Sequence, residues 1–325
     1  MSDAKETIGF VGIGAMGTPM AGHLARAGFP LVVYDLDADR TRDFAAAHPC
    51  RVAASLDELG RASDIVITML PDGNIVRRVL CGARDSFRDC VAGAMKRGAI
   101  VIDMSSSSPV GTRELAPLLE IRGLRLMDAP VSGGVKRAVS AELAIMAGGD
   151  GGLLEACRPL LEKMGRQIFH AGPLGAGHAI KALNNYVSAA GLVAACEAAL
   201  AARRFGIDPN VLVDILNASS GMNNTTVNKM KQFMLSGAYN AGFSTALMAK
   251  DLRMALEIAR ATGTAAPLAA PCVAIWDEME RTLGGKSDHT EMLRFLEDLR
   301  DNRPRNARAA GAGKKTRARA ASKRR

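Results

Sequence analysis

The feature that most constrains the fold is the alternation of short apolar runs with helical patterns in the first half of the chain. Between the first two runs, Met16, Met20 and Leu24 recur at the spacing of one helix face, and Gly28 marks the helix end. Strands that alternate with helices imply a parallel sheet covered on both faces. The sequence therefore predicts a doubly wound α/β domain over residues 1–173. Its strands are expected at Ile8–Val11, Leu31–Tyr34, Ile65–Leu70, Ala99–Asp103, Arg125–Met127, Leu143–Ala147 and Gln167–Phe169.

A change of character near residue 174 indicates a second domain. From there the chain carries helical periodicity almost without strand signals to about residue 299. The longest pattern, from Gly177 to about Phe205, is rich in Ala and short of charge, so most of its circumference should be buried. We expect an all-helical domain over residues 174–299, with further helices at Pro209–Ala218, Val227–Gly237, Thr245–Ala261, Pro267–Leu283 and Asp288–Arg300.

The formal net charge of +9 is concentrated at the end of the chain. Residues 300–325 hold eleven Lys or Arg and one acidic residue, a net charge of +10 that leaves the first 299 residues at −1. This segment has no large apolar residue to offset the entropy of ordering, which predicts a disordered basic tail. A basic balance confined to a tail says nothing about what the folded body binds.

Cysteine usage and the start of the chain favour a reduced, cytoplasmic protein. The six cysteines, at positions 50, 81, 90, 157, 196 and 272, lack the short paired spacing of zinc sites and redox dithiols. Only Met1–Thr7 precede the first apolar run, too few for a signal peptide, and no uninterrupted apolar stretch reaches membrane-spanning length. No grouping of His, Asp and Glu suggests a metal, and a single His178 is more typical of a surface or capping residue.

A glycine motif follows the first strand and opens a helix. It reads Gly12-Ile13-Gly14-Ala15-Met16-Gly17, the G-x-G-x-x-G pattern of Rossmann-type dinucleotide sites. Gly12 permits the tight turn, Gly14 lets a pyrophosphate approach the backbone, and Gly17 allows the helix to pack closely on the strand. The positive end of the helix then attracts the phosphates.

Asp35 bears on the choice of cofactor, because it stands eighteen residues past Gly17 at the end of the second strand. Its carboxylate should accept hydrogen bonds from the adenosine ribose hydroxyls and repel the 2′-phosphate of NADP, which favours NAD. Arg40 and Arg42 follow closely and could soften that preference. The alternatives are a flavin or another nucleotide on the same motif, or a glycine turn with no ligand.

Three further loops follow predicted strands, at the edge where an α/β sheet places its ligand crevice. Met69-Leu70-Pro71 ends the third strand, and Ser105–Ser108 follow the fourth. Asp128-Ala129-Pro130-Val131-Ser132-Gly133-Gly134 follows the fifth, and its Ser-Gly-Gly end can present a hydroxyl and backbone N–H groups to a carboxylate. Each loop could equally be ordinary turn chemistry.

The first turns of the long apolar helix carry a polar stripe. Lys181, Asn185 and Ser188 stand at i, i+4 and i+7 and share one face. Polar groups on a mostly apolar helix need partners when they are desolvated, and a cofactor cleft would supply them. The alternative is a solvent-exposed lysine, which is the more common case for that residue type.

With these motifs together, residues 6–298 resemble the 3-hydroxyisobutyrate dehydrogenase family, also called the β-hydroxyacid dehydrogenases. The matching motifs are Gly12–Gly17, Asp128–Gly134, Gly177–Asn185 and Lys250-Asp251-Leu252. The resemblance implies an NAD(P)-dependent oxidoreductase that transfers a hydride between a nicotinamide and a small 3-hydroxy acid or its semialdehyde. It also implies a homo-oligomer, a dimer or a tetramer, in which the helical domains associate.

The resemblance further implies roles for single residues. Lys181 matches the catalytic lysine, a general acid and base, and Asn185 matches the residue that hydrogen-bonds the substrate. Lys250 would lie near the nicotinamide. Ser132, Gly133 and Gly134 would hold the substrate carboxylate, and Leu70, Pro71 and Ser106 match cofactor-contact positions.

Two relatives fit poorly, and one position departs from the family. Imine-reducing relatives lack the lysine, and 6-phosphogluconate dehydrogenases carry a His at the position of Asn184 and a far larger helical domain. Lys136-Arg137 stand where the family usually has small residues. This pair could admit a second anionic or strongly polar group on the substrate, or could simply be solvated at a helix start.

The basic tail leaves a second class of function open, a nucleic-acid-binding or scaffold protein that keeps a dehydrogenase body. Contacts through such a tail would be salt-sensitive and chiefly independent of sequence. The tail has no aromatic residue to stack on bases, and the body keeps Lys181. Both observations favour the enzyme.

Overall fold

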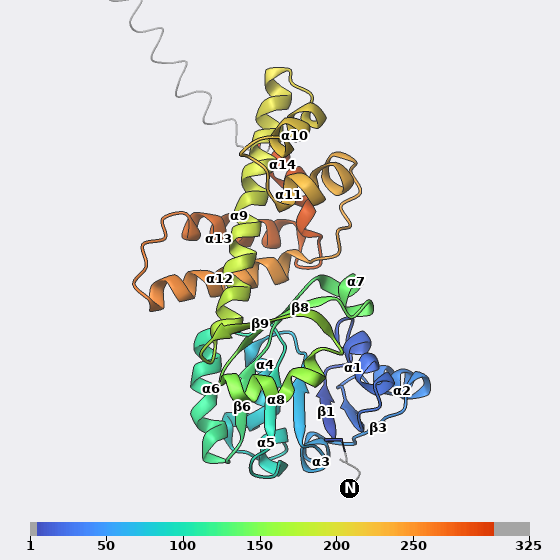
Figure 1. Cartoon of the computed structure of the whole chain (residues 1–325). Helices are drawn as coiled ribbons and strands as arrows, with labels where there is room; N and C mark the ends of the chain where they lie inside the picture. Colours follow the sequence, from blue (N-terminus) through green and yellow to red (C-terminus); the bar gives the residue numbers. More distant parts are fainter. Residues whose placement is uncertain (1–4, 302–325) are drawn as a thin grey trace, which may run out of the picture. The chain divides into compact units, whose positions relative to one another are not determined.

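The computed structural model describes residues 5–301, which pack into two compact units (Figure 1). The first unit runs to Val187 and includes Lys250–Val273, and the second comprises Ser188–Ala249 and the residues from Ala274 on. The two units therefore divide the chain at other positions than residues 173 and 174. The domain boundary predicted there stays a prediction. The predicted basic tail, residues 300–325, lies outside the described residues from 302 on.

A nine-stranded sheet, counted over the described residues, forms the first unit. Its strands are β1 (Ile8–Val11), β2 (Leu31–Tyr34), β3 (Arg51–Val52), β4 (Ile65–Thr68), β5 (Ile100–Asp103), β6 (Arg125–Asp128), β7 (Val131–Ser132), β8 (Leu143–Gly148) and β9 (Gly165–Gly172). They lie in the order β3-β2-β1-β4-β5-β6-β8-β7, and β9 pairs with β8. This order confirms the doubly wound, Rossmann-type fold.

The prediction of a parallel sheet is wrong for β8. Strands β1 to β6 are parallel, whereas β8 runs antiparallel to β6 and β7. The connection from β6 to β8 contains only β7 and the short helix α7 (Gly134–Val139). That leaves no room for the crossover helix that a parallel pairing needs, so the chain turns back.

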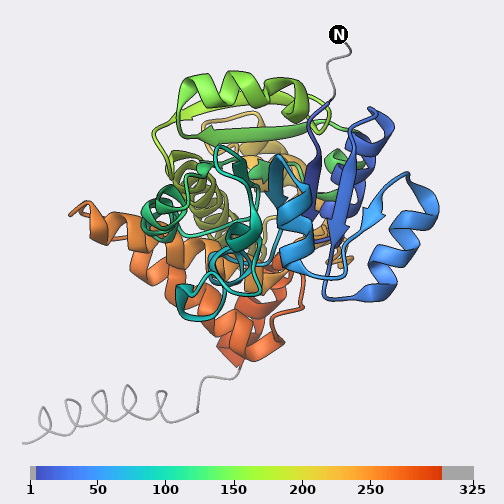
Figure 2. The same ribbon diagram turned by 90° about the horizontal axis from the view of Figure 1, so that it is seen from below.

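Helices cover both faces of this sheet (Figures 1 and 2). The central strands β1, β4 and β5 are buried along their whole length, as expected between two helical layers. Phe10 faces one layer and Val11 the other, because successive strand side chains alternate. The first layer contains α1 (Gly17–Arg26), α2 (Ala38–Ala47) and α8 (Gly151–Leu161), and the second contains α3 (Leu56–Ala62), α4 (Gly73–Cys81), α5 (Val91–Ala94) and α6 (Pro109–Ile121).

The long helix α9 (Ala176–Phe205) begins in the first unit and continues in the second. It matches the helix predicted from Gly177 to about Phe205. By length and mean hydropathy α9 is apolar enough to cross a membrane, which the sequence analysis did not anticipate. Half of its most apolar 18-residue window is buried inside the protein. Core helices of soluble proteins can be equally long and apolar. This feature alone is therefore weak support for a membrane span.

The second unit is helical over its described residues, apart from an isolated bridge between Ser244 and Asp288. The single helix predicted at Val227–Gly237 is wrong, because Asn223 caps a short α11 and Lys229, with φ −132°, interrupts the helix before a π-helical turn. Elements lying wholly or partly in this unit are α10 (Pro209–Asn217), α11 (Asn224–Asn228), the π-turn η2 (Met230–Leu235), α12 (Thr245–Ala261), α13 (Ala269–Leu283), the 3-10 turn η3 (His289–Glu291) and α14 (Met292–Asp301).

Candidate active site

The glycine motif forms the turn between β1 and α1. Gly12 has φ +101°, and a Cβ there would lie 2.3 Å from the Met69 carbonyl oxygen. A Cβ at Gly17 would lie 1.8 Å from the Gly12 carbonyl oxygen, so only glycine lets the helix start this close to the strand. At Gly14 the nearest atom would be Nη1 of Arg40 at 3.7 Å, which leaves the backbone open to an approaching group. The predicted turn and packing roles of Gly12 and Gly17 are thus confirmed.

The start of α1 fits an anionic group. Its N-cap residue, Met16, provides no side-chain hydrogen bond to the first turn of the helix. Ile13 is buried beneath the turn, and Ala15 is exposed at its surface. Uncapped N–H groups and the helix dipole together favour a phosphate here. The residues present therefore fit a dinucleotide pyrophosphate.

Asp35 follows β2 and is held beside this turn. Its Oδ2 accepts a hydrogen bond from the Ile13 N–H at 2.7 Å, and its Oδ1 accepts one from the Asp37 N–H at 2.9 Å. Nη1 of Arg40 lies 3.9 Å from Oδ2. Arg42 instead pairs with Asp39 and Asp43. Of the two arginines, Arg40 is therefore the one placed at this carboxylate.

Lys250 is the residue of α12 at which the first unit resumes, and it joins the loops after β4 and β5. Its Nζ donates hydrogen bonds to the carbonyl oxygens of Pro71 and Ser106, each at 2.8 Å. The Leu70 N–H donates to Ser105 Oγ at 2.9 Å. Burial lowers the pKa of Lys250, against the opposing effect of nearby carboxylates. The structure thus brings together Leu70, Pro71, Ser106 and Lys250, four positions that the resemblance assigned to the cofactor.

Asp103 holds the ends of these two strands, a role that the sequence analysis missed. Its Oδ1 accepts hydrogen bonds from Thr68 Oγ1 at 2.9 Å and from the Ser105 N–H at 3.0 Å. Its Oδ2 accepts one from Ser107 Oγ at 2.6 Å. An acidic residue at the end of a buried strand, followed by a run of serines, was the available signal.

The Ser-Gly-Gly loop leads from β7 into α7. Gly133 and Gly134 have φ of +132° and +65°, values that favour glycine, and both are exposed. Ser132 is half-buried, and its hydroxyl makes no hydrogen bond to any part of the chain that the structure describes. Arg137 folds back on this loop, because a Cβ at Gly133 would lie 2.6 Å from Arg137 Cδ. A hydroxyl and backbone amides are therefore free for a ligand.

The start of α9 is anchored by Asp128 and His178. The two carboxylate oxygens of Asp128 accept hydrogen bonds from the N–H groups of Gly175 at 2.7 Å and His178 at 2.8 Å. The buried His178 ring lies 2.8 Å from Thr112 Oγ1 and 3.1 Å from the Ser105 carbonyl oxygen. The expectation of a surface or capping His178 is wrong, because residues distant in sequence enclose its ring.

Asn185 contacts the first-unit part of α12, and Lys181 stands one turn earlier on the same face of α9. Lys181 is half-buried, and its pKa is lowered by burial and by Lys250 but raised by Asp251. Asn185 is buried and donates a hydrogen bond from Nδ2 to Oδ2 of Asp251. Ser188, the third member of the stripe, lies in the second unit, where its Oγ accepts from Asn224 at 3.5 Å. The environment of Lys181 is therefore not that of a freely solvated lysine.

These groups lie along the carboxyl edge of the sheet. A Cβ at Gly12 would lie 3.1 Å from Leu70 Cδ2, which links the glycine turn to the loop after β4. Ser132 pairs with Ala144 of β8, and Gly177 of α9 packs against the Met146 carbonyl oxygen on the same strand. The predicted dinucleotide, carboxylate and lysine positions thus belong to one region of the first unit.

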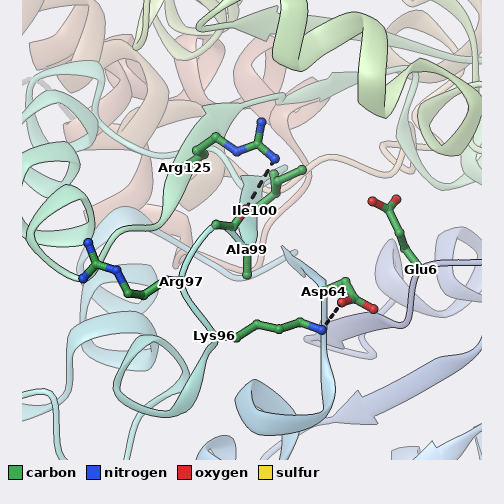
Figure 3. A pocket seen from close by; sticks show the side chains of 8 residues that line it. Glu6, Asp64, Lys96, Arg97, Ala99, Ile100 and Arg125 are labelled. Atoms are coloured by element: carbon green, nitrogen blue, oxygen red, sulfur yellow. Dashed lines mark hydrogen bonds and ion pairs between the residues drawn. The ribbon is translucent and has the colours of Figure 1, made fainter.

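A charged hollow of about 250 Å³ lies at the opposite, amino edge of the sheet (Figure 3). Asp64 and Lys96 form an ion pair in its wall, and Arg125 donates to the Gly98 carbonyl oxygen at 3.4 Å. Ligands of α/β sheets bind at the carboxyl ends of the strands. This hollow is therefore separate from the candidate site.

Thiols and metal-type ligands add nothing to the site. The six cysteines are free, and five of them are buried. Residues 5–301 contain no group of three His, Cys, Asp or Glu side chains arranged to hold a metal ion.

A dinucleotide turn with an acidic residue after the second strand, and a half-buried lysine at the same edge, define an NAD(P)-dependent oxidoreductase.

Comparison with known proteins identifies the family. Residues 7–172 match the family model for the NAD binding domain of 6-phosphogluconate dehydrogenase, and residues 175–296 match that for the NAD-binding of NADP-dependent 3-hydroxyisobutyrate dehydrogenase. The chain is 36% identical to mitochondrial 3-hydroxyisobutyrate dehydrogenase of Mus musculus over 301 residues, 91% of this chain and 88% of that one. It is 33% identical to 2-(hydroxymethyl)glutarate dehydrogenase of Eubacterium barkeri over 293 residues, 90% of this chain and 95% of that one.

A solved structure agrees with these sequences. The structure of Mycobacterium tuberculosis 3-hydroxyisobutyrate dehydrogenase with L-serine superposes with a TM-score of 0.81 at 36% identity, covering 90% of this chain and 99% of that one. The chain belongs to the 3-hydroxyisobutyrate dehydrogenase family. It is an NAD(P)-dependent dehydrogenase of 3-hydroxy acids.

Proposed function

We propose that this protein interconverts a 3-hydroxy acid and its semialdehyde, with Lys181 carrying the proton. The observation that carries this proposal is the setting of Lys181, half-buried on α9 beside the buried Asn185 and within reach of the charges of Lys250 and Asp251. Burial lowers the pKa of its ammonium. A lysine whose pKa is lowered in this way more readily loses its proton, so that it can both accept and donate one during turnover.

Lys181 handles the proton in both directions. A bound nicotinamide would supply the hydride acceptor for oxidation and the hydride donor for reduction. The neutral amine of Lys181 takes the hydroxyl proton of the alcohol, and its ammonium gives a proton to the aldehyde oxygen. Asn185 would hold that oxygen through its second Nδ2–H, because the first is donated to Asp251. Ser132 Oγ and the N–H groups of Gly133 and Gly134 would bind the carboxylate.

The cofactor would lie on the glycine turn with its adenosine ribose at Asp35. Leu70, Pro71, Ser106 and Lys250 would contact its other half. The fixed Asp35 carboxylate supports a preference for NAD, because it would accept the ribose hydroxyls and repel a 2′-phosphate.

The substrate, in this proposal, carries a second anionic or strongly polar group recognised by Lys136 and Arg137. Both side chains are exposed directly after the carboxylate loop, and the Arg137 guanidinium has no partner among residues 5–301. The relative named 2-(hydroxymethyl)glutarate dehydrogenase is named for a dicarboxylate, which supports the idea. Arg137 is the better candidate of the pair, since its stem already packs on Gly133.

A substrate panel tests this function. NAD and NADP reduction would be measured with 3-hydroxyisobutyrate, glycerate, threonate, serine, 2-(hydroxymethyl)glutarate and a sulfonated analogue. We expect turnover of several acids and the highest kcat/KM for one with a second anionic or polyhydroxy group. Silence across the panel in both directions would contradict the enzyme assignment, and preference for plain 3-hydroxyisobutyrate would reject the role of the basic pair.

A matched pair of variants locates the second group. Arg137→Ser should lower kcat/KM for the preferred acid by about tenfold to a hundredfold, the effect of losing one hydrogen bond to a charged group. Activity on plain 3-hydroxyisobutyrate should stay near that of the wild type. Arg166→Ser, the same change at an exposed arginine of β9, should leave both activities unchanged.

The family also supports a homo-oligomer. On the first-unit part of α9, Ile180, Leu183 and Val187 are 43%, 40% and 70% exposed at i, i+3 and i+7. Such an apolar stripe is costly in water and would be covered in a dimer or a tetramer.

A further inference from the structure

Asp251 is a buried carboxylate to which the sequence analysis gave no role. It follows Lys250 on α12 and is 1% exposed. Its Oδ2 accepts the hydrogen bond from Asn185 Nδ2. Its Oδ1 is buried without a hydrogen-bond partner, and Lys250 Nζ lies 3.8 Å from it, too far for a hydrogen bond.

A buried carboxylate oxygen without a donor is costly, so a nearby cation is expected to compensate it. Lys250 is already engaged, because its Nζ donates to the carbonyl oxygens of Pro71 and Ser106. Lys181 makes no hydrogen bond within the described part of the chain, and its charge interacts with that of Asp251. Lys181 is therefore a second cation that acts on Asp251 beside Lys250, and it stands one helical turn before Asn185, the hydrogen-bond donor to Asp251.

The surrounding charges make this pairing specific. The groups that act on Asp251 are Lys250 on α12 and Lys181 and His178 on α9. Asp251 is the acidic group that acts on Lys181, whereas burial and Lys250 both favour its neutral amine. Lys250 in turn faces Asp72 and Asp103, at the carboxyl ends of β4 and β5. Without the negative charge of Asp251, the two remaining influences on Lys181, burial and the charge of Lys250, would both lower its pKa.

We propose that Asp251 is a positioning residue for the dehydrogenase reaction, an inference that rests on the proposed function. It orients the amide of Asn185, so that one Nδ2–H stays free for the substrate oxygen. Its negative charge also favours the ammonium form of Lys181, against the effect of burial. Asp251 therefore acts through its two neighbours on α9 rather than on the substrate.

The titration of Lys181 tests this proposal without turnover. Acetylation of the full chain by trace acetic anhydride, followed by mass spectrometry, measures the fraction of neutral amine at each pH. In Asp251→Asn the Lys181 titration should move to lower pH by about one unit, because a nearby opposite charge is lost. The acidic limb of alcohol oxidation and the basic limb of aldehyde reduction should both move to lower pH with it.

Two variants serve as controls. Asp251→Glu keeps the charge and should return the titration towards that of the wild type. Asp150→Asn makes the same change at the N-cap aspartate of α8, which does not act on Lys181, and should leave the titration in place. If Asp251→Asn does not fold, Asp251→Ser provides the same comparison.

The outcomes are distinct. An unchanged Lys181 titration in Asp251→Asn would overturn the proposal even if turnover falls, because the residue would then be merely structural. A wild-type protein that oxidises no hydroxy acid would refute the proposed function instead. Acetylation would still decide in that case whether Asp251 controls the charge of Lys181.

Discussion

At the scale of the residue, the proposed choice of cofactor depends on Asp35. Asp35 is fixed by the N–H groups of Ile13 and Asp37, and Arg40 lies 3.9 Å from its Oδ2. Arg42 is engaged with Asp39 and Asp43. In the proposed function this carboxylate favours NAD, and Arg40 beside it also pairs with Asp37, its Nε lying 3.2 Å from Asp37 Oδ2.

Asp35→Ser should weaken the preference for NAD. It removes the carboxylate that would accept the ribose hydroxyls and repel a 2′-phosphate, so the ratio of kcat/KM with NAD to that with NADP should fall by about tenfold to a hundredfold, the range of one hydrogen bond to a charged group. Initial rates with both cofactors measure this ratio. Arg42→Ser should leave it unchanged, and equal efficiency of the wild type with both cofactors would contradict the account.

Single residues were predictable where local sequence determines their role. The turn at Gly12, the close packing at Gly17 and the position of Asp35 all follow from one short motif beside a strand. Asp251 was not predictable, because its partner Asn185 lies 66 positions away and only tertiary packing brings them together. The same holds for His178 and Thr112, also 66 positions apart.

At the scale of the element, the start of α9 sets the position of Lys181. Asp128 binds two backbone N–H groups of the first turn, and a Cβ at Gly177 would lie 2.0 Å from the Met146 carbonyl oxygen. Lys181 follows His178 by three residues, within one helical turn. The sheet and the first turn of α9, the helix that carries Lys181, are therefore connected through Asp128.

Asp128→Asn should lower the free energy of unfolding by about 1–3 kcal/mol, because the amide offers one acceptor oxygen to two buried N–H groups. Chemical denaturation measures the loss. Asp150→Asn is a matched control, since Asp150 caps α8 through the Leu153 N–H and Asn caps helices equally well. An equal loss of unfolding free energy in both variants would mean that Asp128 stabilises the protein no more than an ordinary helix cap does.

The effect at Asp128 should depend on pH in a definite direction. Burial raises its pKa, although His178 and the backbone hydrogen bonds oppose this, so the native pKa exceeds the unfolded one. The stabilising contribution is then full below the unfolded pKa and is lost as the pH rises through the native pKa. The stability difference between wild type and Asp128→Asn should therefore be larger near pH 4 than near pH 8, around the ordinary Asp pKa and well above it. A difference that grows with pH would contradict this account.

The bounds of helices and strands were predictable where the apolar periodicity is strong. The direction of each strand in the sheet was not predictable. The bounds of β1, β2 and α12 agree with the sequence prediction to the residue. The reversal at β8 has no signature in an apolar run, because parallel and antiparallel strands share the same alternation. The π-turn Met230–Leu235 escaped detection because Met230 and Met234, both buried, keep a helix-like spacing.

At the scale of the whole molecule, net charge does not explain substrate binding. Without residues 300–325 the chain carries −1, so the binding of an anionic acid in the proposed function depends on local groups, such as Ser132 and the backbone N–H groups of the carboxylate loop. The change from α/β to helical character was visible in the sequence. The packing of residues 174–187 and 250–273 into the first unit was not, because it depends on contacts between distant segments.

The most direct test of the central claim is the turnover of Lys181→Ala on the preferred acid, measured beside NAD binding by the same preparation. The account predicts that kcat falls by about a hundredfold to ten-thousandfold, the usual contribution of a general acid or base, while NAD affinity is retained. Lys163→Ala, at an exposed lysine of the first unit, should leave both unchanged. Near-normal turnover of Lys181→Ala would contradict the account.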